Sequence, residues 1–170
     1  MWVGGPNYVS PDNGYGIAYY PAGSGWTGDY SVEARIKFQA GAYGGGIGGR
    51  LVDLDPSSPA YGARYGLWVY PEDSPSGTPL TLGLVKFTDW GNWSGQFLQS
   101  ASLTSVGTGW HTVKLVFQGS QIQAYFDGVL QFTVTDQQDA YLSGGVSLDM
   151  WNETPGSAYT MSVDYVTVHP

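Results

Sequence analysis

Residues 109–136, GWHTVKLVFQGSQIQAYFDGVLQFTVTD, contain three consecutive strand patterns. In each of them apolar and polar residues alternate, and a period of two places successive side chains on opposite faces of a strand. Gly119-Ser120 separates the first two patterns, and Asp127-Gly128 separates the last two at the spacing of a two-residue hairpin turn. The residues predicted to face inward are Val113, Leu115, Phe117, Ile122, Ala124, Phe126, Leu130, Phe132 and Val134. The stretch therefore predicts an antiparallel meander whose apolar face must be covered by a second sheet.

Strand patterns recur along the rest of the chain. They are found within the first twenty residues and at 29–39, 61–70, 80–87, 144–151 and 158–168. Glycine replaces most side chains in GAYGGGIGGRL, residues 41–51, which indicates either a tight bend or the close approach of another backbone or of a ligand. Many short strands between turns predict an all-β fold, a two-sheet antiparallel β-sandwich of the jelly-roll type.

The composition narrows the classes of partner. The 170 residues show no linker and no shift in composition, so we expect a single domain spanning residues 1–170. A net charge of −8 with only six Lys and Arg argues against a nucleic-acid partner, since phosphate binding depends on clustered cations. No apolar run approaches the roughly 20 residues of a membrane span, which argues against membrane insertion. Charged residues make up only 12%, so a surface of neutral polar residues is predicted, and it suits neutral polar ligands.

Four segments resemble a known family. They are WHTVKL at 110–115, QIQAYFDGVL at 121–130, GGVSLD at 144–149 and MSVDYVTV at 161–168. Their order resembles the concanavalin A-like (laminin G-like) jelly rolls of lectins, glucanases and modules of large secreted bacterial and archaeal proteins. The resemblance implies an extracellular location, secreted or at the cell surface. We expect Met1 to be an artificial start within a larger protein, with any signal peptide and neighbouring domains removed.

Catalytic residues are not evident. The glucanases of that family carry Glu-x-Asp-x-Glu or Glu-x-Asp-x-x-Glu on one strand, and this chain has neither motif. The nearest carboxylate pair is Asp53 and Asp55, followed at once by Pro56, and we favour a loop cap or a metal site over a catalytic role for it. No serine lies in a Gly-x-Ser-x-Gly elbow. The sequence favours a protein that is not an enzyme, although carboxylates from distant strands stay possible.

Aromatic residues are the predicted binding groups, since flat rings stack on the apolar faces of sugars while amides and hydroxyls bond sugar hydroxyls. Trp90 and Trp93 lie in the glycine-flanked turn 88–96, and we expect at least one of them to be exposed. The alternative is that one of them plugs the sandwich edge. Weaker candidates for carbohydrate binding are Tyr43, Trp68, Tyr70 and Trp151, whereas Trp26 and Trp110 are expected to pack at the core or edge.

The outward face of the meander is the other predicted surface. Gln123 and Tyr125 belong to an amide and hydroxyl lattice that either solubilises the sheet or lines a glycan cleft. Asp164 shares a face of its strand with two valines, so it needs a partner if that face is buried. The resemblance implies a structural calcium held by Asp164 with Asp12 and Asn13. A bond to backbone amides or a place at an exposed edge are the alternatives for Asp164.

The functional hypothesis that follows is a non-catalytic, lectin-like module that binds a polysaccharide or other neutral glycan through surface aromatics. A structural or adhesive extracellular module, or a filament subunit that self-associates, is the first alternative. A glycoside hydrolase or lyase with an unrecognised site is the second.

Overall fold

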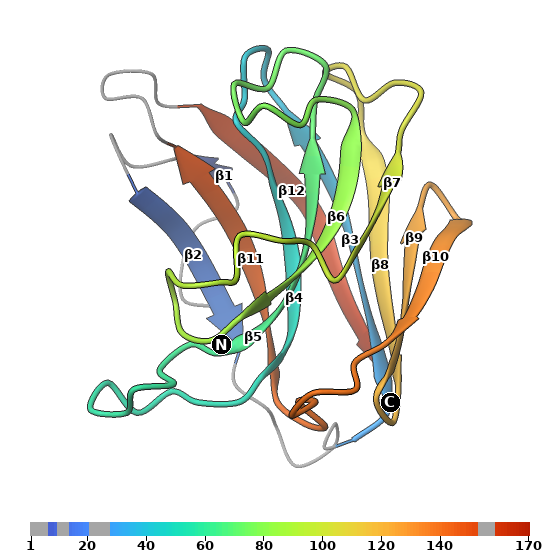
Figure 1. Cartoon of the computed structure of the whole chain (residues 1–170). Helices are drawn as coiled ribbons and strands as arrows, with labels where there is room; N and C mark the ends of the chain where they lie inside the picture. The colour runs from blue at the N-terminus through green and yellow to red at the C-terminus, as the bar shows by residue number, and fades with distance from the viewer. Residues whose placement is uncertain (1–6, 10–13, 21–27, 153–158) are drawn as a thin grey trace.

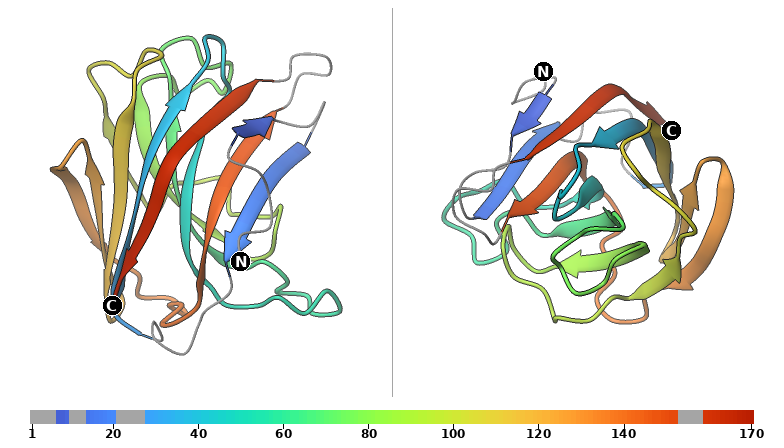
Figure 2. Two further views of the ribbon diagram at one scale, coloured as in Figure 1. Left: turned by 180° about the vertical axis from the view of Figure 1, so that it is seen from behind. Right: turned by 90° about the horizontal axis from the view of Figure 1, so that it is seen from above.

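The computed structural model describes residues 7–9, 14–20, 28–152 and 159–170, which form two antiparallel sheets packed face to face (Figure 1). The described residues contain no helix, so no helix among them could span a membrane. Seen from above, the two sheets enclose one interior (Figure 2). The strands are β1 (Asn7–Val9), β2 (Gly14–Tyr20), β3 (Tyr30–Phe38), β4 (Gly45–Leu51), β5 (Arg64–Tyr70), β6 (Thr81–Phe87), β7 (Gln99–Ser102), β8 (His111–Gln118), β9 (Gln121–Phe126), β10 (Val129–Thr135), β11 (Gly145–Asn152) and β12 (Thr160–His169). The predicted two-sheet β-sandwich is confirmed.

Each sheet has six strands. The first, which we call the meander sheet, has the order β1-β12-β3-β8-β9-β10 and contains the hairpins predicted from residues 109–136. The second, which we call the glycine sheet, has the order β2-β11-β4-β5-β6-β7, with the glycine-rich β4 near its centre. Strands distant in sequence are neighbours in both sheets, so the fold depends on long-range pairing. The short β7, at an edge of the glycine sheet, was not predicted.

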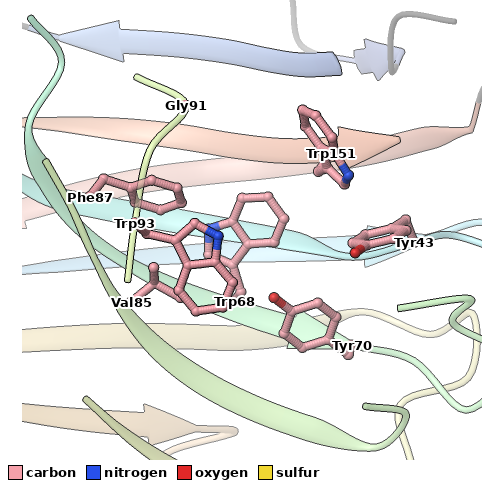
Figure 3. A pocket seen from close by; sticks show the side chains of 8 residues that line it. All are labelled: Tyr43, Trp68, Tyr70, Val85, Phe87, Gly91, Trp93 and Trp151. Carbon is pink, nitrogen blue, oxygen red and sulfur yellow. The ribbon is translucent and has the colours of Figure 1, made fainter. Parts of the chain in front are cut away.

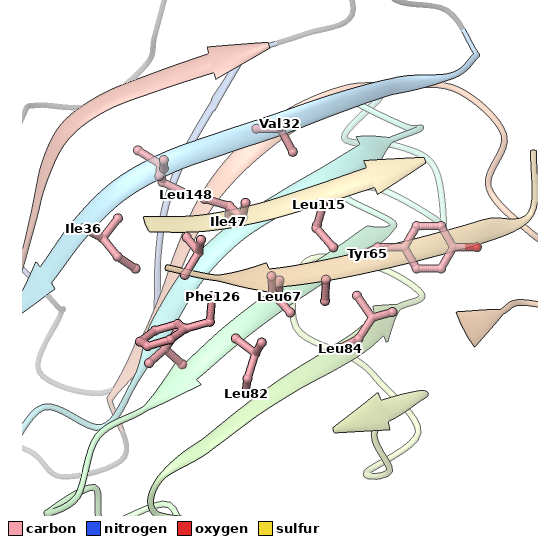
Figure 4. Packing of buried hydrophobic residues seen from close by; sticks show 14 of the residues in the cluster. Val32, Ile36, Ile47, Tyr65, Leu67, Leu82, Leu84, Leu115, Phe126 and Leu148 are labelled. Carbon is pink, nitrogen blue, oxygen red and sulfur yellow. The ribbon is translucent and has the colours of Figure 1, made fainter. Parts of the chain in front are cut away.

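The hydrophobic core lies between the sheets and consists of the inward side chains of both (Figure 4). Along β3, every second residue from Tyr30 to Phe38 is buried and the residues between them are partly exposed, as predicted. In β5, Tyr65, Leu67 and Val69 enter this core. The remaining side chains of β5 are nevertheless buried as well. The glycine sheet is therefore covered on its outer face too, and that face contains the candidate site.

The meander is confirmed except near the turn between β9 and β10. Asp127 and Gly128 have φ angles of 48° and 76°, the positive values that a two-residue hairpin turn requires. Leu130 was predicted to be buried but is 46% exposed. The register between β9 and β10 shifts between Leu130 and Phe132, and such a bulge turns the side chain before it away from the core.

Residues 41–51 form a strand rather than a tight bend over most of their length. β4 pairs with β11 on one side and β5 on the other, and its glycines mark the close approach of neighbouring groups. On the core side, a Cβ added at Gly49 would lie 2.4 Å from Cε2 of Phe117. The core ring therefore occupies the space that a side chain at position 49 would need.

We predict that Gly49→Ala destabilises the protein by about 1–3 kcal/mol, because the added methyl group overpacks the core against Phe117. Gly109→Ala is the matched control: a Cβ there meets only His111 Nε2, at 3.8 Å, and should change stability by less than about 0.5 kcal/mol. Urea unfolding of both variants measures the difference. Equal midpoints would show that Phe117 moves aside without cost.

Glu72 fixes the loop that precedes β8. Its Oε2 accepts a hydrogen bond from the backbone N–H of Gly107 at 2.8 Å, and its Oε1 accepts bonds from the N–H of Val106 at 2.8 Å and from Oγ of Ser105 at 2.9 Å. The bonds from the Gly107 and Val106 amides lower the pKa of Glu72 to about 2. The ionised carboxylate therefore stabilises the folded loop.

The lowered pKa sets the sign of a pH effect. A carboxyl group that is more acidic in the folded state contributes stability above its unfolded pKa, about 4.5, and loses it as the pH falls towards about 2. We predict that Glu72→Gln has a lower melting temperature than the wild-type protein at pH 7 and that the gap narrows between pH 4.5 and pH 2. Thermal melts across this range test it, and a gap that stays constant would contradict the assignment.

Candidate functional site

The outer face of the glycine sheet carries a second, smaller hydrophobic cluster. Because side chains alternate along a strand, β5 sends Trp68 and Tyr70 outward while Tyr65, Leu67 and Val69 enter the core. On the neighbouring strand, Val85 and Phe87 of β6 join them. Their burial on an outward face means that loops cover this part of the sheet.

The cluster forms the floor of a pocket of about 190 Å³. Figure 3 shows Tyr43, Tyr70 and Trp151 at one end of this pocket and Phe87 and Val85 at the other. The Tyr43 and Tyr70 rings have centroids 6.3 Å apart, and those of Trp68 and Tyr70 are 6.1 Å apart. The lining residues are Tyr43, Trp68, Tyr70, Val85, Phe87, Gly91, Trp93 and Trp151, and none of them is Asp, Glu, Lys, Arg or His.

Trp93 is the exposed ring of this pocket. The turn before it is fixed by Asp89, whose carboxylate accepts hydrogen bonds from the side-chain amide of Asn92 at 2.7 Å and from the N–H groups of Gly91 and Asn92 at 2.8 Å. These bonds, led by the Asn92 side chain, lower the pKa of Asp89. A bridge to Phe87 then places Trp93 beside the pocket, where its side chain is 36% exposed. The prediction that one of the two loop tryptophans is exposed is thus met by Trp93.

Trp90, in contrast, packs onto the sheet. Its ring centroid lies 5.6 Å from that of Tyr61 and 5.7 Å from that of Tyr19, and its backbone N–H donates to the Tyr61 carbonyl at 2.9 Å. A Cβ on Gly62 would lie 2.1 Å from Cδ2 of Trp90, so glycine at 62 makes room for the ring. Trp90 is partly exposed and packs against its neighbours, as in the alternative of a plug, and its role as a stacking ring stays a prediction.

Beneath Trp90 lies a fully buried ion pair. Nε of Arg64 on β5 donates to Oδ2 of Asp149 on β11 at 2.8 Å, and both side chains have zero exposure. Between these strands runs β4, where Gly48 leaves the space open; a Cβ there would lie 2.1 Å from Oγ of Ser147 and 3.3 Å from Cδ of Arg64. Nη1 of Arg64 also donates to the carbonyl of Gly62 at 2.9 Å. The pair therefore ties two strands to the loop that supports Trp90.

Sequence reasoning missed this pair, although a signal was present. Arg64 opens a strand of otherwise apolar and glycine residues, and Asp149 lies within the strand pattern at 144–151. One of these predicted buried strands carries a single positive charge and the other a single negative charge. Because a buried charge requires a partner, this pattern predicts that the two side chains form an ion pair.

The predicted residues Gln123 and Tyr125 lie elsewhere. They point outward from β9 in the meander sheet, on the opposite side of the sandwich from the pocket, where the Tyr125 hydroxyl donates to Oε1 of Gln123 at 3.1 Å. Trp110 was expected to pack at the core or edge but is 37% exposed. Its ring lies under Lys37, whose Nζ is 4.8 Å from the ring centroid. Trp26 lies outside the described residues. The predicted aromatic and amide surfaces are thus two separate faces.

The predicted metal ligands are not brought together within the described residues. The side chain of Asp164 is 47% exposed and accepts a hydrogen bond from Nη1 of Arg35 at 2.9 Å, while Asp12 and Asn13 lie outside the described residues. A register shift between Val163 and Tyr165 explains the irregular pattern of β12, because the bulge reverses which residues face inward. A carboxylate paired with arginine is a poor start for a hard-cation site. The calcium site stays a prediction.

Asp53 and Asp55 act as loop caps. Oδ1 of Asp53 accepts a hydrogen bond from the N–H of Asp55 at 2.9 Å, and Oδ1 of Asp55 accepts one from the N–H of Ser57 at 2.9 Å. Such bonds two residues ahead are typical of Asx-turns. Of the loop cap and the metal site that the sequence left open, the structure shows the loop cap.

We predict that Asp149→Ala lowers the free energy of unfolding by about 3–5 kcal/mol, because it leaves the Arg64 guanidinium buried without its partner. The double variant Arg64→Met/Asp149→Leu should lose less than Asp149→Ala alone, since it removes both charges. Asp164→Ala breaks a surface ion pair of 2.9 Å, close to the 2.8 Å of the buried pair, and should cost less than about 1 kcal/mol. Urea unfolding compares the three; similar losses from the two single variants would contradict the analysis.

No protein-family model and no curated protein matches the sequence. Solved structures do match in shape. The carbohydrate-binding module CBM66 from Bacillus subtilis aligns with a TM-score of 0.68 and 14% identity over 95% of this chain and 86% of that one. The Bacillus licheniformis β-glucanase aligns at 0.64 and 13%, covering 92% and 71%, and the Emp47p carbohydrate recognition domain at 0.64 and 12%, covering 98% and 89%. The chain has the concanavalin A-like jelly-roll fold that these proteins share.

Proposed function

We propose that the protein is a non-catalytic carbohydrate-binding module and that a neutral glycan binds in the aromatic pocket on the outer face of the glycine sheet. The observation that carries the proposal is the pocket itself, lined by tryptophan and tyrosine rings with Trp93 open to solvent. A carbohydrate-binding module and a carbohydrate recognition domain are among the proteins of similar shape, which supports the same class of ligand.

The lining chemistry favours a neutral sugar. Aromatic faces attract the C–H surfaces of a pyranose or furanose ring, and the tyrosine hydroxyls of the rim can bond its hydroxyl groups. An acidic sugar would need a cation beside it, and the pocket lining contains no Lys or Arg. The three cations on the outward face of the meander sheet, Arg35, Lys37 and Lys114, are on the other side of the sandwich.

The acidic residues near the pocket favour binding over catalysis. Glycosidases use two carboxyl groups, one of them a general acid with a raised pKa. Among the described strands of the glycine sheet, Asp149 is the one acidic residue, and Arg64 holds it in a buried ion pair. Asp89, in the loop beside the pocket, has a lowered pKa because it accepts hydrogen bonds from Asn92 and Gly91. Neither carboxylate suits a general acid.

We predict that Trp93→Ala weakens glycan binding at least tenfold and leaves the melting temperature nearly unchanged, because the ring is exposed and supplies contact area to the ligand rather than to the core. Trp110→Ala is the matched control: it removes a ring of almost the same exposure, 37% against 36%, from the other side of the sandwich. Affinity electrophoresis and calorimetry with β-1,3-glucan, β-1,3-1,4-glucan and mucin provide the measurement, since relatives in shape act on these glycans by name.

Equal losses of glycan affinity in the two variants would contradict a site at the pocket. If the wild-type protein binds no glycan of the panel, the proposed function is contradicted. The same panel run with calcium and with a chelator tests the predicted calcium site at Asp164, Asp12 and Asn13. Release of reducing sugar from any glycan of the panel would instead support the glycoside hydrolase alternative. An extracellular location, and a place within a larger protein, belong to this proposal.

A self-associating structural or adhesive module is the second candidate, favoured by three exposed hydrophobic residues. Val129, Leu130 and Leu142 are 61%, 46% and 56% exposed, and the first two lie at the start of β10, an edge strand of the meander sheet. Open strand edges with apolar side chains pair readily with other chains. Analytical sedimentation of the wild-type protein and of Val129→Lys separates this candidate from the first. If both proteins are monomers, the self-associating module is ruled out.

A further inference from the structure

Three buried polar atoms beside the aromatic pocket have no hydrogen-bond partner in the protein. They are Nη2 of Arg64, Oδ1 of Asp149 and Oγ of Ser147. All three side chains belong to fully buried residues of the glycine sheet. Leaving a buried polar group unpaired costs about 1–3 kcal/mol, and more when it is charged. Such a cost in three adjacent groups is a reason to look for a bound molecule that pairs with them.

The three side chains lie close together on the outward face of the glycine sheet. Ser147 and Asp149 are two residues apart on β11 and so share its outward face, and Arg64 reaches Asp149 over Gly48 of the intervening strand. Oγ of Ser147 occupies the place that a Cβ at position 48 would take, 2.1 Å from it. The guanidinium donor of Arg64, the carboxylate acceptor of Asp149 and the hydroxyl group of Ser147, which can do both, thus lie around Gly48.

Phe87 lies between these polar side chains and the aromatic pocket. Its ring lines the pocket, as Figure 3 shows, and its centroid lies 4.1 Å from Cζ of Arg64 on the other side. Trp90 packs over Arg64, with its ring centroid 4.9 Å from Cζ of Arg64, and the next residue, Gly91, lines the pocket. The aromatic pocket and the cluster of Arg64, Ser147 and Asp149 are therefore neighbours on one sheet face, and the loop that carries Trp90 lies beside both.

We propose that Arg64, Asp149 and Ser147 form a second subsite for two adjacent hydroxyl groups of the sugar residue next to the one held in the aromatic pocket. The inference rests on the proposed function and adds to it that the ligand has at least two sugar units. Nη2 of Arg64 donates to one hydroxyl oxygen, Oδ1 of Asp149 accepts from the neighbouring hydroxyl, and Oγ of Ser147 bonds either. The ion pair is neutral overall, so the subsite selects an uncharged diol.

Access to the subsite requires Trp90 to move away from it. Two contacts between Arg64 and the loop are long: Nη1 lies 3.4 Å from the carbonyl oxygen of Asp89 and 3.5 Å from that of Trp90. The stronger bond of Nη1 goes to the carbonyl of Gly62, outside this loop. Displacing Trp90 leaves the Arg64–Asp149 pair intact. The apparent affinity then equals the affinity of the open form multiplied by the fraction of molecules in which Trp90 is displaced.

Water is the other source of hydroxyl groups that could pair with these atoms, and Ser147→Ala separates the two. The serine Oγ makes no hydrogen bond within the protein, so its removal should leave the melting temperature unchanged or slightly raised. If the subsite binds sugar, the variant loses a ligand contact only for ligands long enough to reach it.

The experiment measures calorimetric affinities of the wild-type protein, Ser147→Ala, Trp93→Ala and a control, Ser100→Ala. Ser100 is exposed on β7, the edge strand of the same sheet. The probes are trisaccharides of β-1,3-glucan and β-1,3-1,4-glucan, a mucin O-glycan trisaccharide, and the monosaccharide of whichever one binds. We expect Ser147→Ala to weaken trisaccharide binding about three- to tenfold, the range of one hydrogen bond, and to leave monosaccharide binding unchanged.

The outcomes separate the inference from the function beneath it. Normal trisaccharide affinity in Ser147→Ala, with the loss seen in Trp93→Ala, would mean that the polar atoms hold water, and the subsite would be overturned while the proposed function stands. A fall in melting temperature in Ser147→Ala would assign the hydroxyl a structural role and overturn the subsite as well. Absence of binding to every probe by the wild-type protein would overturn both.

Discussion

The glycines of β4 are the constraint on which the rest of this structure depends. On the core side, Gly49 admits the ring of Phe117 from the meander sheet, which brings the two sheets together. On the outer side, Gly48 lets Arg64 reach Asp149 two strands away. A bulky residue at either position would separate groups that now touch. Two adjacent glycines of one strand thus set both the sheet packing and the arrangement of polar groups outside it.

The sequence was sufficient for the fold wherever a period of two ran without interruption. The alternation in β3, β8 and β9 predicted their buried faces correctly, because each residue there pairs in regular register. It failed where a strand contains a bulge: Leu130 precedes one in β10, and Asp164 lies at another in β12. An extra residue reverses the faces beyond it, and nothing in the local pattern indicates where partner strands will shift.

The site was predictable only in part, because composition reveals which side chains are suited to binding but not which share a surface. Trp93, Trp68 and Tyr43 meet in one pocket, as their chemistry suggested. Trp90, three residues before Trp93 and in the same kind of turn, packs onto the sheet because Gly62 leaves room for it, a contact between residues 28 apart. Gln123 and Tyr125 had suitable groups, yet their sheet faces the other way.

The strand beneath the pocket, β5, is buried on both faces and hydrogen-bonded on both edges, to β4 and β6. Amides in such a position exchange their hydrogens with solvent only when much of the molecule unfolds. The pocket floor therefore keeps its shape unless the fold itself opens. Any change in the shape of the pocket has to come from the two loops at its rim, one between β3 and β4 with Tyr43 and one between β6 and β7 with Gly91 and Trp93.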